Sequence, residues 1–357
     1  MISPSSHSPA FVSEAIDAEP HSLQVQNCTA YCSVLVARFT RILTLSCLIW
    51  TYPNLATAEP DLSIEPISPI PTAMTFDSGK VALGKRLFSD TRLSYENGVS
   101  CASCHIAEHK LTDGKAISRG LPGAPGETNV PTLYNVGLNP MHGWAGQSKT
   151  LEEQVDMVVR KKSTMGAYWD GVIAILTNDE SLSSAFSAVY ADGITQATIT
   201  DALAEYERSL VTPNAPFDKF LRGDDNAINE QAKAGYILFK NYGCSSCHQG
   251  VNVGGNMFQV FGIFSKPDDL PDPHTPGAAK NTGIDDTRPV FRVPPLRNVA
   301  ETGPYFHNGS AETLPEAIKI MGSRQLGRDL SDDDVTKLYE FLKSLSGEYN
   351  GVSVSGR

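Results

Sequence analysis

The sequence has little positive charge and no apolar run long enough to cross a membrane as a helix. Its 29 lysines and arginines are outnumbered by 40 aspartates and glutamates, so the formal net charge is −11. Nucleic-acid-binding proteins depend on basic contacts to phosphates, so this balance argues against nucleic acid as a partner. The apolar run at residues 42–50 is too short to span a bilayer. At 357 residues and 41% hydrophobic content, the chain can still form two domains with real cores.

Cysteine is also scarce, with seven residues in the chain. Three of them lie before residue 50, in a segment that we expect to be removed. The other four form two pairs of identical spacing, each followed at once by histidine: Cys101-Ala-Ser-Cys104-His105 and Cys244-Ser-Ser-Cys247-His248. A disulfide framework does not account for the histidines. The alternatives are a thioredoxin-like redox pair or half of a zinc site, but no second ligand pair is evident nearby.

The Cys-x-x-Cys-His motif is typical of c-type haem attachment. Its two thiols add across the vinyl groups of one haem, and the next residue presents its imidazole to the iron. We therefore predict two covalently bound c-type haems, one held by Cys101, Cys104 and His105 and the other by Cys244, Cys247 and His248. The sixth position of each iron then decides the function. Histidine/methionine ligation suits electron transfer, whereas an open position suits peroxide chemistry.

The N-terminal region has the pattern of a secretory signal peptide. Arg38 and Arg41 precede the apolar run, and Ala56-Thr57-Ala58 follows it. A positive flank, an apolar centre and small residues at the end predict cleavage after Ala58, with export to the periplasm. Residues 1–58 are then a signal and N-terminal extension, and an uncleaved membrane anchor is the alternative.

A weak internal repeat organises the rest of the chain. Gly84-Lys-Arg-Leu-Phe precedes the first haem motif, and Gly235-Tyr-Ile-Leu-Phe precedes the second. We predict a mainly α fold with two related helical haem domains, residues 59–212 and 213–357, joined near Pro213. The stretches 111–147 and 249–312 are rich in glycine, proline and asparagine, and loops of that length are usually functional.

One predicted helix near the C-terminus carries a methionine on its apolar face. Thr313 and Glu316 are spaced as a capping box, with Pro315 in the first turn. Leu314, Ala317, Ile318 and Met321 then fall on one face. From this pattern alone, Met321 is read as filling the core.

Several further segments occur in a characteristic order. They are Leu83-Gly84-Lys85-Arg86-Leu87-Phe88, Asn129-Val130-Pro131-Thr132-Leu133-Tyr134-Asn135, Leu151-Glu152-Glu153-Gln154, Val293-Pro294-Pro295-Leu296-Arg297-Asn298-Val299, Gly303-Pro304-Tyr305-Phe306-His307-Asn308-Gly309-Ser310 and Met321-Gly322-Ser323-Arg324-Gln325-Leu326-Gly327. With these segments the chain resembles the bacterial di-haem cytochrome c peroxidase family, which also contains MauG-type enzymes, from about residue 81 to 346. The resemblance implies two cytochrome c-like helical domains with a calcium ion at their interface. It also implies that the N-terminal haem is peroxidatic and that the C-terminal haem takes up electrons.

The resemblance also implies roles for individual residues. Met321 matches the axial methionine of the electron-accepting haem, a position at which MauG has tyrosine. Trp144 matches a tryptophan between the haems, and Gln154 matches a glutamine of the distal pocket. Without the resemblance, Trp144 reads as an ordinary buried aromatic residue and Gln154 as a solvated helix residue.

Asn129, Thr302 and Pro304 match the calcium-binding positions of the family, partly through backbone carbonyl groups. Such oxygen ligands suit Ca²⁺. Without the resemblance, the same residues read as ordinary turn formers.

The chain departs from the family pattern at three places. Thr164 stands where the family has a glutamate thought to move protons, and threonine does not titrate. The family's Trp-Asp-Gly-Arg is Trp144-Ala145-Gly146-Gln147 here. No histidine lies between Gly120 and Gly126, the loop that carries the family's displaceable distal histidine. The sixth ligand of the N-terminal iron is therefore open on sequence grounds.

The function that these observations predict is a periplasmic peroxidase. It would reduce hydrogen peroxide with electrons from a small cytochrome c or a cupredoxin, and we also expect a homodimer. One alternative is a MauG-like oxidase of a partner protein's side chain. The other is an electron-transfer cytochrome without catalysis, which would have two six-coordinate haems.

Overall fold

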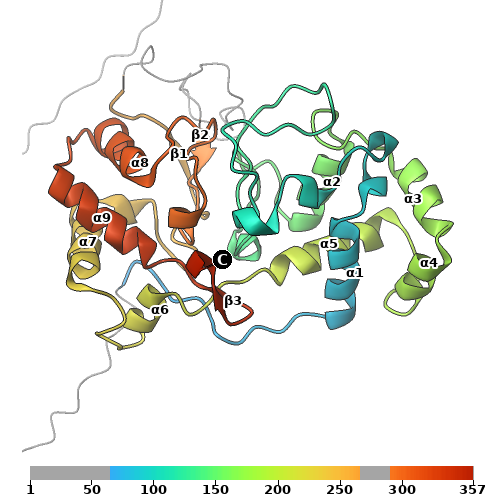
Figure 1. Ribbon diagram of the computed structural model, residues 1–357, viewed down its shortest axis with the longest axis horizontal. Coiled ribbons are helices and arrows are strands. Elements are labelled where there is room, and N and C mark those ends of the chain that lie inside the picture. Colours follow the sequence, from blue (N-terminus) through green and yellow to red (C-terminus); the bar gives the residue numbers. More distant parts are fainter. Residues whose placement is uncertain (1–64, 266–289, 357) are drawn as a thin grey trace, which may run out of the picture. The chain divides into compact units, whose positions relative to one another are not determined.

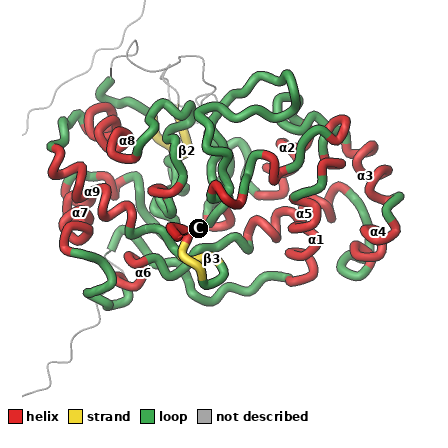
Figure 2. Tube along the Cα trace, in the orientation of Figure 1, coloured by secondary structure: helices red, strands yellow, loops and turns green. Residues whose placement is uncertain are grey.

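The computed structural model describes residues 65–265 and 290–356, and this part of the chain is mostly helical (Figures 1 and 2). The first half contains α1 (Ser78–Phe88), α2 (Leu151–Arg160), α3 (Trp169–Thr177), α4 (Glu180–Ser187) and α5 (Gln196–Arg208). The second half contains α6 (Pro216–Leu221), α7 (Glu230–Asn241), α8 (Leu314–Ile320) and α9 (Asp332–Lys343). Two short antiparallel strand pairs join β1 (Phe258–Val260) to β2 (Val290–Arg292) and β3 (Glu348–Tyr349) to β4 (Val352–Ser353). The predicted mainly α fold with long loops is confirmed.

The predicted signal peptide and its cleavage site after Ala58 lie outside the described residues. Among the helices within residues 65–265 and 290–356, none combines the length and the apolar character needed to cross a membrane. Export stays a prediction.

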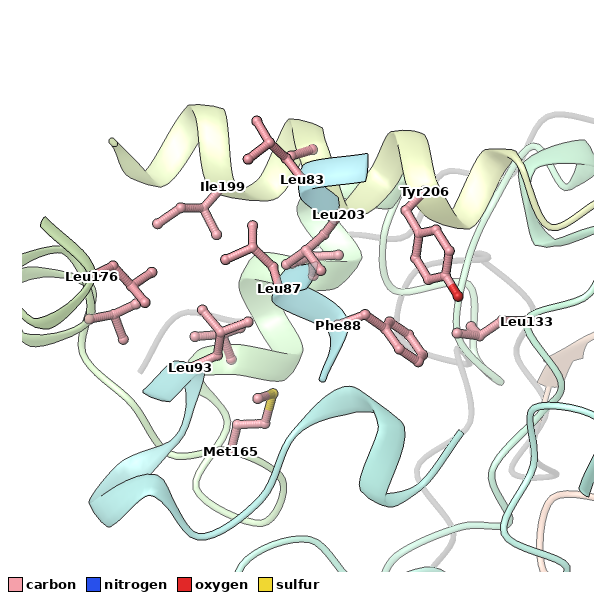
Figure 3. Packing of buried hydrophobic residues seen from close by; sticks show 14 of the residues in the cluster. Leu83, Leu87, Phe88, Leu93, Leu133, Met165, Leu176, Ile199, Leu203 and Tyr206 are labelled. Carbon is pink, nitrogen blue, oxygen red and sulfur yellow. The ribbon is translucent and has the colours of Figure 1, made fainter. Parts of the chain in front are cut away.

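Two hydrophobic cores form, one in each half of the chain. The first lies mainly between α1 and α5, where Leu83, Leu87 and Phe88 meet Ile199, Leu203 and Tyr206 (Figure 3). The second lies mainly between α7 and α9, where the ring of Phe341 is 5.0 Å from those of both Phe217 and Phe239. Each core contains one haem-motif cysteine at its edge, Cys101 or Cys244.

The internal repeat is visible in how closely these helix pairs pack. A side chain on Gly84 in α1 would collide with the carbonyl oxygen of Ala202 in α5. In the second half, a side chain on Gly235 in α7 would collide with the carbonyl oxygen of Lys337 in α9. Glycine is required at both positions because two helix backbones touch there.

A buried polar network joins the two halves at Thr212. The Thr212 hydroxyl lies 2.7 Å from Nδ2 of Asn135 and 3.0 Å from Nδ2 of Asn298. The backbone N–H of Thr212 donates to Oδ1 of Asn135, and that of Gly347 donates to Oδ1 of Asn298. Both asparagines have a left-handed backbone, with φ of 61° and 62°, which asparagine tolerates better than most residues. The network fixes both halves to the segment that connects them.

The two ends of the described chain each pack on the opposite half. Ile67 is fully buried in the second core, and Arg297 donates to the carbonyl oxygen of Ser68 at 3.0 Å. Val354 is fully buried in the first core, and the Tyr349 ring lies 5.5 Å from that of Tyr134. The predicted domain ranges, 59–212 and 213–357, stay a prediction, and the packing shows that these end segments cross between the two cores.

Substitution Gly84→Ala should lower the free energy of unfolding by about 1–3 kcal/mol, because the added methyl group overpacks the α1–α5 contact. Gly171→Ala is the matched control. Gly171 also lies within a helix, α3, but has open space around it, so alanine there should be neutral or stabilising by about 0.5–1 kcal/mol. Thermal and denaturant unfolding of both variants measures the difference. Equal stability of the two would contradict the close packing.

Candidate active site

Both Cys-x-x-Cys-His motifs form the same tight turn. Cys101–Ser103 and Cys244–Ser246 are single 3₁₀ turns. The backbone N–H of His105 donates to Cys101 O, and that of His248 donates to Cys244 O, each at 2.9 Å. None of the four cysteines forms a disulfide. Each turn therefore presents two thiols and one imidazole within five residues, as covalent haem attachment requires.

The imidazole of His105 is held in one orientation. Its Nδ1 lies 2.9 Å from the carbonyl oxygen of Leu111, so the Nδ1–H donates and Nε2 carries the free electron pair. A hydrogen bond of this kind is what orients a metal-ligating histidine. Burial lowers the pKa of His105, and it lowers the pKa of His248 to about 4. Both rings are therefore neutral at pH 7, which is the form that binds a metal.

One cavity of about 500 Å³ brings the predicted site residues together. All of them line it: Cys101, Cys104, His105, Asn129, Trp144, Gln154, Cys244, Cys247, His248, Thr302, Pro304 and Met321. They come from both halves of the chain, separated by up to 220 positions in sequence. The volume is in the range of cofactor and ligand sites. The roles predicted for these residues stay predictions, but their juxtaposition is what those roles require.

The walls of the cavity suit a large apolar ring with charged edges. Apolar side chains from both halves line it, including Leu133, Val155, Phe239, Val293 and Leu338. A c-type haem has a flat apolar macrocycle and two carboxylates at its rim. The apolar walls fit the macrocycle. The buried guanidinium of Arg292, which also lines the cavity, fits a carboxylate.

Arg292 lies in β2, and sequence reasoning missed it. Its Nε donates to Gly143 O at 3.0 Å, and its backbone N–H donates to Trp144 O at 2.9 Å. Its Nη1 is buried and has no hydrogen-bond partner among residues 65–265 and 290–356. Burial lowers the pKa of Arg292 to about 10, so the side chain is still charged at pH 7. Within the described residues Arg292 forms no ion pair, and a buried cation without a counter-charge is costly, so a haem carboxylate would relieve that cost.

The sequence did contain a signal for Arg292, since it is a lone charge in the otherwise uncharged stretch of residues 289–296. Glu207 was missed in the same way. It lies one turn beyond Leu203 on the inward face of α5 and lines the cavity. Burial raises the pKa of Glu207 to about 8.

Trp144 lies at the join between the halves. Its indole N–H donates to Asn129 O at 2.9 Å, and the backbone N–H of Asn129 donates to His307 O at 2.7 Å. The edge of the Trp144 ring meets His307, with centroids 6.3 Å apart, and His307 stacks on Phe291 at 4.5 Å. Asn129 and Trp144 from the first half are thus interlocked with the second half. Trp144 is only partly buried and lines the cavity, so it is not an ordinary core aromatic residue, and its predicted role between two haem sites stays a prediction.

Gln154 and Thr164 both belong to the α2 region. Gln154 Oε1 is buried without a hydrogen-bond partner and lines the cavity, which differs from the solvated reading of this residue. The Thr164 hydroxyl donates to Val158 O at 2.5 Å and lies 2.9 Å from Lys161 O. The Thr164 hydroxyl therefore hydrogen-bonds to carbonyl oxygens at the end of α2 and is not available as an acid.

Two histidines that follow the first motif in sequence, His109 and His142, are placed differently in the structure. His142 is buried, lines the cavity and has an Nδ1 without a partner. Burial, helped by the charges of Arg292 and Arg208, lowers the pKa of His142 to about 4. His109 lies in a 3₁₀ turn directly after the first motif and does not line the cavity.

The calcium positions contain no cluster of acidic ligands. Within residues 65–265 and 290–356, no three His, Cys, Asp or Glu side chains gather as a metal site. Thr302 precedes the cis peptide bond between Gly303 and Pro304, and Asn129 of the first half contacts the second half through its N–H bond to His307 O. A cation there would depend on amide, hydroxyl and backbone oxygens, which is chemistry that suits Ca²⁺.

Comparison with known proteins agrees with this geometry. A family model described as di-haem cytochrome c peroxidase matches residues 78–226, and a cytochrome c model matches residues 232–346. A cytochrome c peroxidase of Escherichia coli is 40% identical over 81% of this chain, which spans 63% of that protein's length. A cytochrome c551 peroxidase of Nitrosomonas europaea is 39% identical over 80% of this chain and 85% of its own.

A solved structure with the same fold is that of a MauG-like protein associated with microbial copper homeostasis. It has a TM-score of 0.69 and 27% identity, covering 84% of this chain and 95% of that one. The two attachment motifs and the helical fold define a c-type cytochrome with two haem sites. The chain belongs to the di-haem cytochrome c peroxidase family.

Arg292→Met should lower the reduction potential of at least one haem, because the lost positive charge had favoured the reduced state. We expect a shift on the order of 50 mV, which corresponds to roughly 1 kcal/mol for a one-electron couple. Arg292→Lys, which keeps the charge, should shift the potential less. Spectroelectrochemical titration measures both variants. Unchanged potentials in Arg292→Met would show that the guanidinium does not face a haem.

Proposed function

We propose that this protein is a periplasmic peroxidase. It reduces hydrogen peroxide to two water molecules. The reaction takes up two protons from solvent and two electrons from a small cytochrome c or a cupredoxin. The proposal is supported by relatives named cytochrome c peroxidase at about 40% identity over most of the chain.

The observation that carries the proposal is that the two predicted haem sites, which share one cavity, have different side chains beside the same Cys-x-x-Cys-His turn. Both centres have a neutral histidine on a Cys-x-x-Cys-His turn, because desolvation lowers the pKa of each imidazole. The helix that lines the cavity in the second half, α8, leads directly into Met321, whereas α2 in the first half presents Gln154. A thioether is an iron ligand that suits electron transfer, and an amide is not.

The bound haems supply the redox chemistry, and the protein sets their ligands, access and electrostatics. His105, oriented by its hydrogen bond to Leu111 O, would hold the iron of the first haem and donate electron density to it. Gln154 offers an unpaired Oε1 that can hold a polar reactant such as hydrogen peroxide. Met321 and His248 would hold the iron of the second haem, and Trp144 lies between the two halves, where electrons would cross.

The substitution at Thr164 favours a second candidate function, oxidation of a side chain in a partner protein. Without the family's glutamate, proton delivery during peroxide reduction depends on another group. MauG-type relatives and a MauG-like structure are similar to this chain. Met321, where MauG has tyrosine, weighs against this alternative, so peroxide reduction with an external electron donor remains the proposal.

A calcium ion and a homodimer are further parts of the proposal. Asn129, Thr302 and Pro304 line the cavity at the join, where a bound cation would fix the two sites relative to one another. The homodimer rests on the family resemblance alone.

Steady-state oxidation of a reduced small cytochrome c by hydrogen peroxide tests the proposed activity. The holoprotein should turn over at about 1–1,000 s⁻¹, a typical range for enzymes. Gln154→Ala should reduce turnover by roughly tenfold or more, the scale of one lost transition-state hydrogen bond. The exposed Gln231→Ala on α7 serves as the control and should keep full activity. Turnover no faster than that of free haem would refute the activity.

Removal of calcium should inactivate the enzyme and change the spectrum of the half-reduced protein. Treatment with a chelator, followed by return of Ca²⁺ or Mg²⁺, makes the measurement. We expect Ca²⁺ alone to restore the spectrum, because Mg²⁺ demands a tighter octahedral site. If elemental analysis finds no calcium and chelation has no effect, the calcium part of the proposal is wrong.

A further inference from the structure

In both halves of the chain, the loop before the cavity-lining helix has the same backbone structure. An isolated antiparallel β-bridge pairs His142 with Ser148 in the first half, and another pairs Tyr305 with Ala311 in the second. In both, the residue after the first bridge partner has a positive φ, 78° at Gly143 and 68° at Phe306. The residue numbers differ by the same constant at every position.

The same offset continues into the helices. Thr150 caps α2 by accepting from the backbone N–H of Glu153 at 3.2 Å, and Thr313 caps α8 by accepting from Glu316 at 3.3 Å. The Glu153 carboxylate accepts from the backbone N–H of Lys149.

The Glu316 carboxylate accepts in the same way from the backbone N–H of Glu312. The expected capping box at Thr313 is thus modified: its glutamate accepts from the residue before the N-cap and not from the N-cap itself, and the same holds at Thr150. The two helices therefore begin in the same register.

This register pairs Val158 with Met321. Both lie two helical turns into their helix, after the buried residues Leu151 and Leu314. Val158 is within α2, and Met321, which directly follows α8 and is the first residue of a π-helical turn (Met321–Gln325), still has helical angles, φ −63° and ψ −40°. Both side chains line the cavity.

One turn earlier the register pairs Gln154 with the buried Ala317. The first half thus has an amide followed by an aliphatic side chain, and the second half has a methyl group followed by a thioether. The backbone is the same in both halves, but the group that can bind a ligand or iron is at the earlier position in the first half and at the later position in the second.

We propose that Val158 occupies, in the first half, the place that the axial methionine has in the second, and that it keeps the N-terminal iron open. This inference rests on the proposed role of Met321 as an iron ligand. Valine has no electron pair to offer, and the Thr164 hydroxyl bond to its carbonyl oxygen fixes the backbone there. The other methionines of the cavity lie elsewhere, because Met157 pairs with Ile320 and Met165 is buried in the first core (Figure 3).

Val158→Met tests the inference in the two-haem holoprotein, with Val158→Leu as the control of similar size. Val158→Met should convert the ferric N-terminal haem from high spin to low spin and add a second methionine-to-iron charge-transfer band. It should also weaken cyanide binding at that iron by about tenfold or more. Val158→Leu should keep the wild-type spin state. Electron-spin-resonance and absorption spectra, together with a haem count for each variant, provide the readout.

The inference is overturned if Val158→Met binds two haems and has the same spin state as Val158→Leu. It is also overturned if the N-terminal iron of the unmodified protein already carries a methionine in the oxidised and half-reduced states. If Val158→Met does not bind two haems, Met321→Val decides, because it should give the C-terminal iron the high-spin signature of the N-terminal one. Failure to do so also overturns the inference.

These spectra are independent of turnover. Absence of peroxidase activity combined with the expected spin change would refute the proposed function and leave the assignment of Val158 intact.

Discussion

The arrangement of both haem sites depends on the buried amide–hydroxyl network at Thr212. Asn135 and Asn298 occupy equivalent places in the two halves, and both side chains converge on that one hydroxyl. Their left-handed backbones turn the chain just before the loops that carry Trp144 and His307. Because an unsatisfied buried amide costs about 1–3 kcal/mol, the three residues hold one another in a single arrangement. A single cavity that contains both motifs follows from this fixed relation.

The sequence was sufficient to predict the local chemistry of the site. The two haem motifs depend on spacing within five residues, and the helix leading to Met321 depends on a cap and a period of 3.6, so both can be read along the chain. Arg292 was missed because its role depends on contacts with Gly143 and Trp144, almost 150 positions earlier. Gln154 was read from the residues alone as solvated, but its Oε1 is buried in the cavity, which is lined by residues from both halves of the chain.

The departures from the family pattern become intelligible in the structure. Thr164 bonds to the last carbonyl groups of α2, a structural task that a longer carboxylate would not perform with the same geometry. Buried titratable groups remain at the cavity in Glu207 and His142. Loss of one proton-carrying residue therefore does not leave the cavity without others. One duplicated scaffold carries two different sets of side chains, and its function depends on that difference.

The crossing of the chain ends has a consequence for how the protein comes apart. Ile67 is anchored in the second core and Val354 in the first, so each half holds a segment that belongs, by sequence, to the other. Proteolytic cleavage of the connector near Pro213 would leave two fragments that stay associated non-covalently through these exchanged end segments. The two halves are therefore held together by this exchange of end segments as well as by the connector, and their association does not require an intact connector.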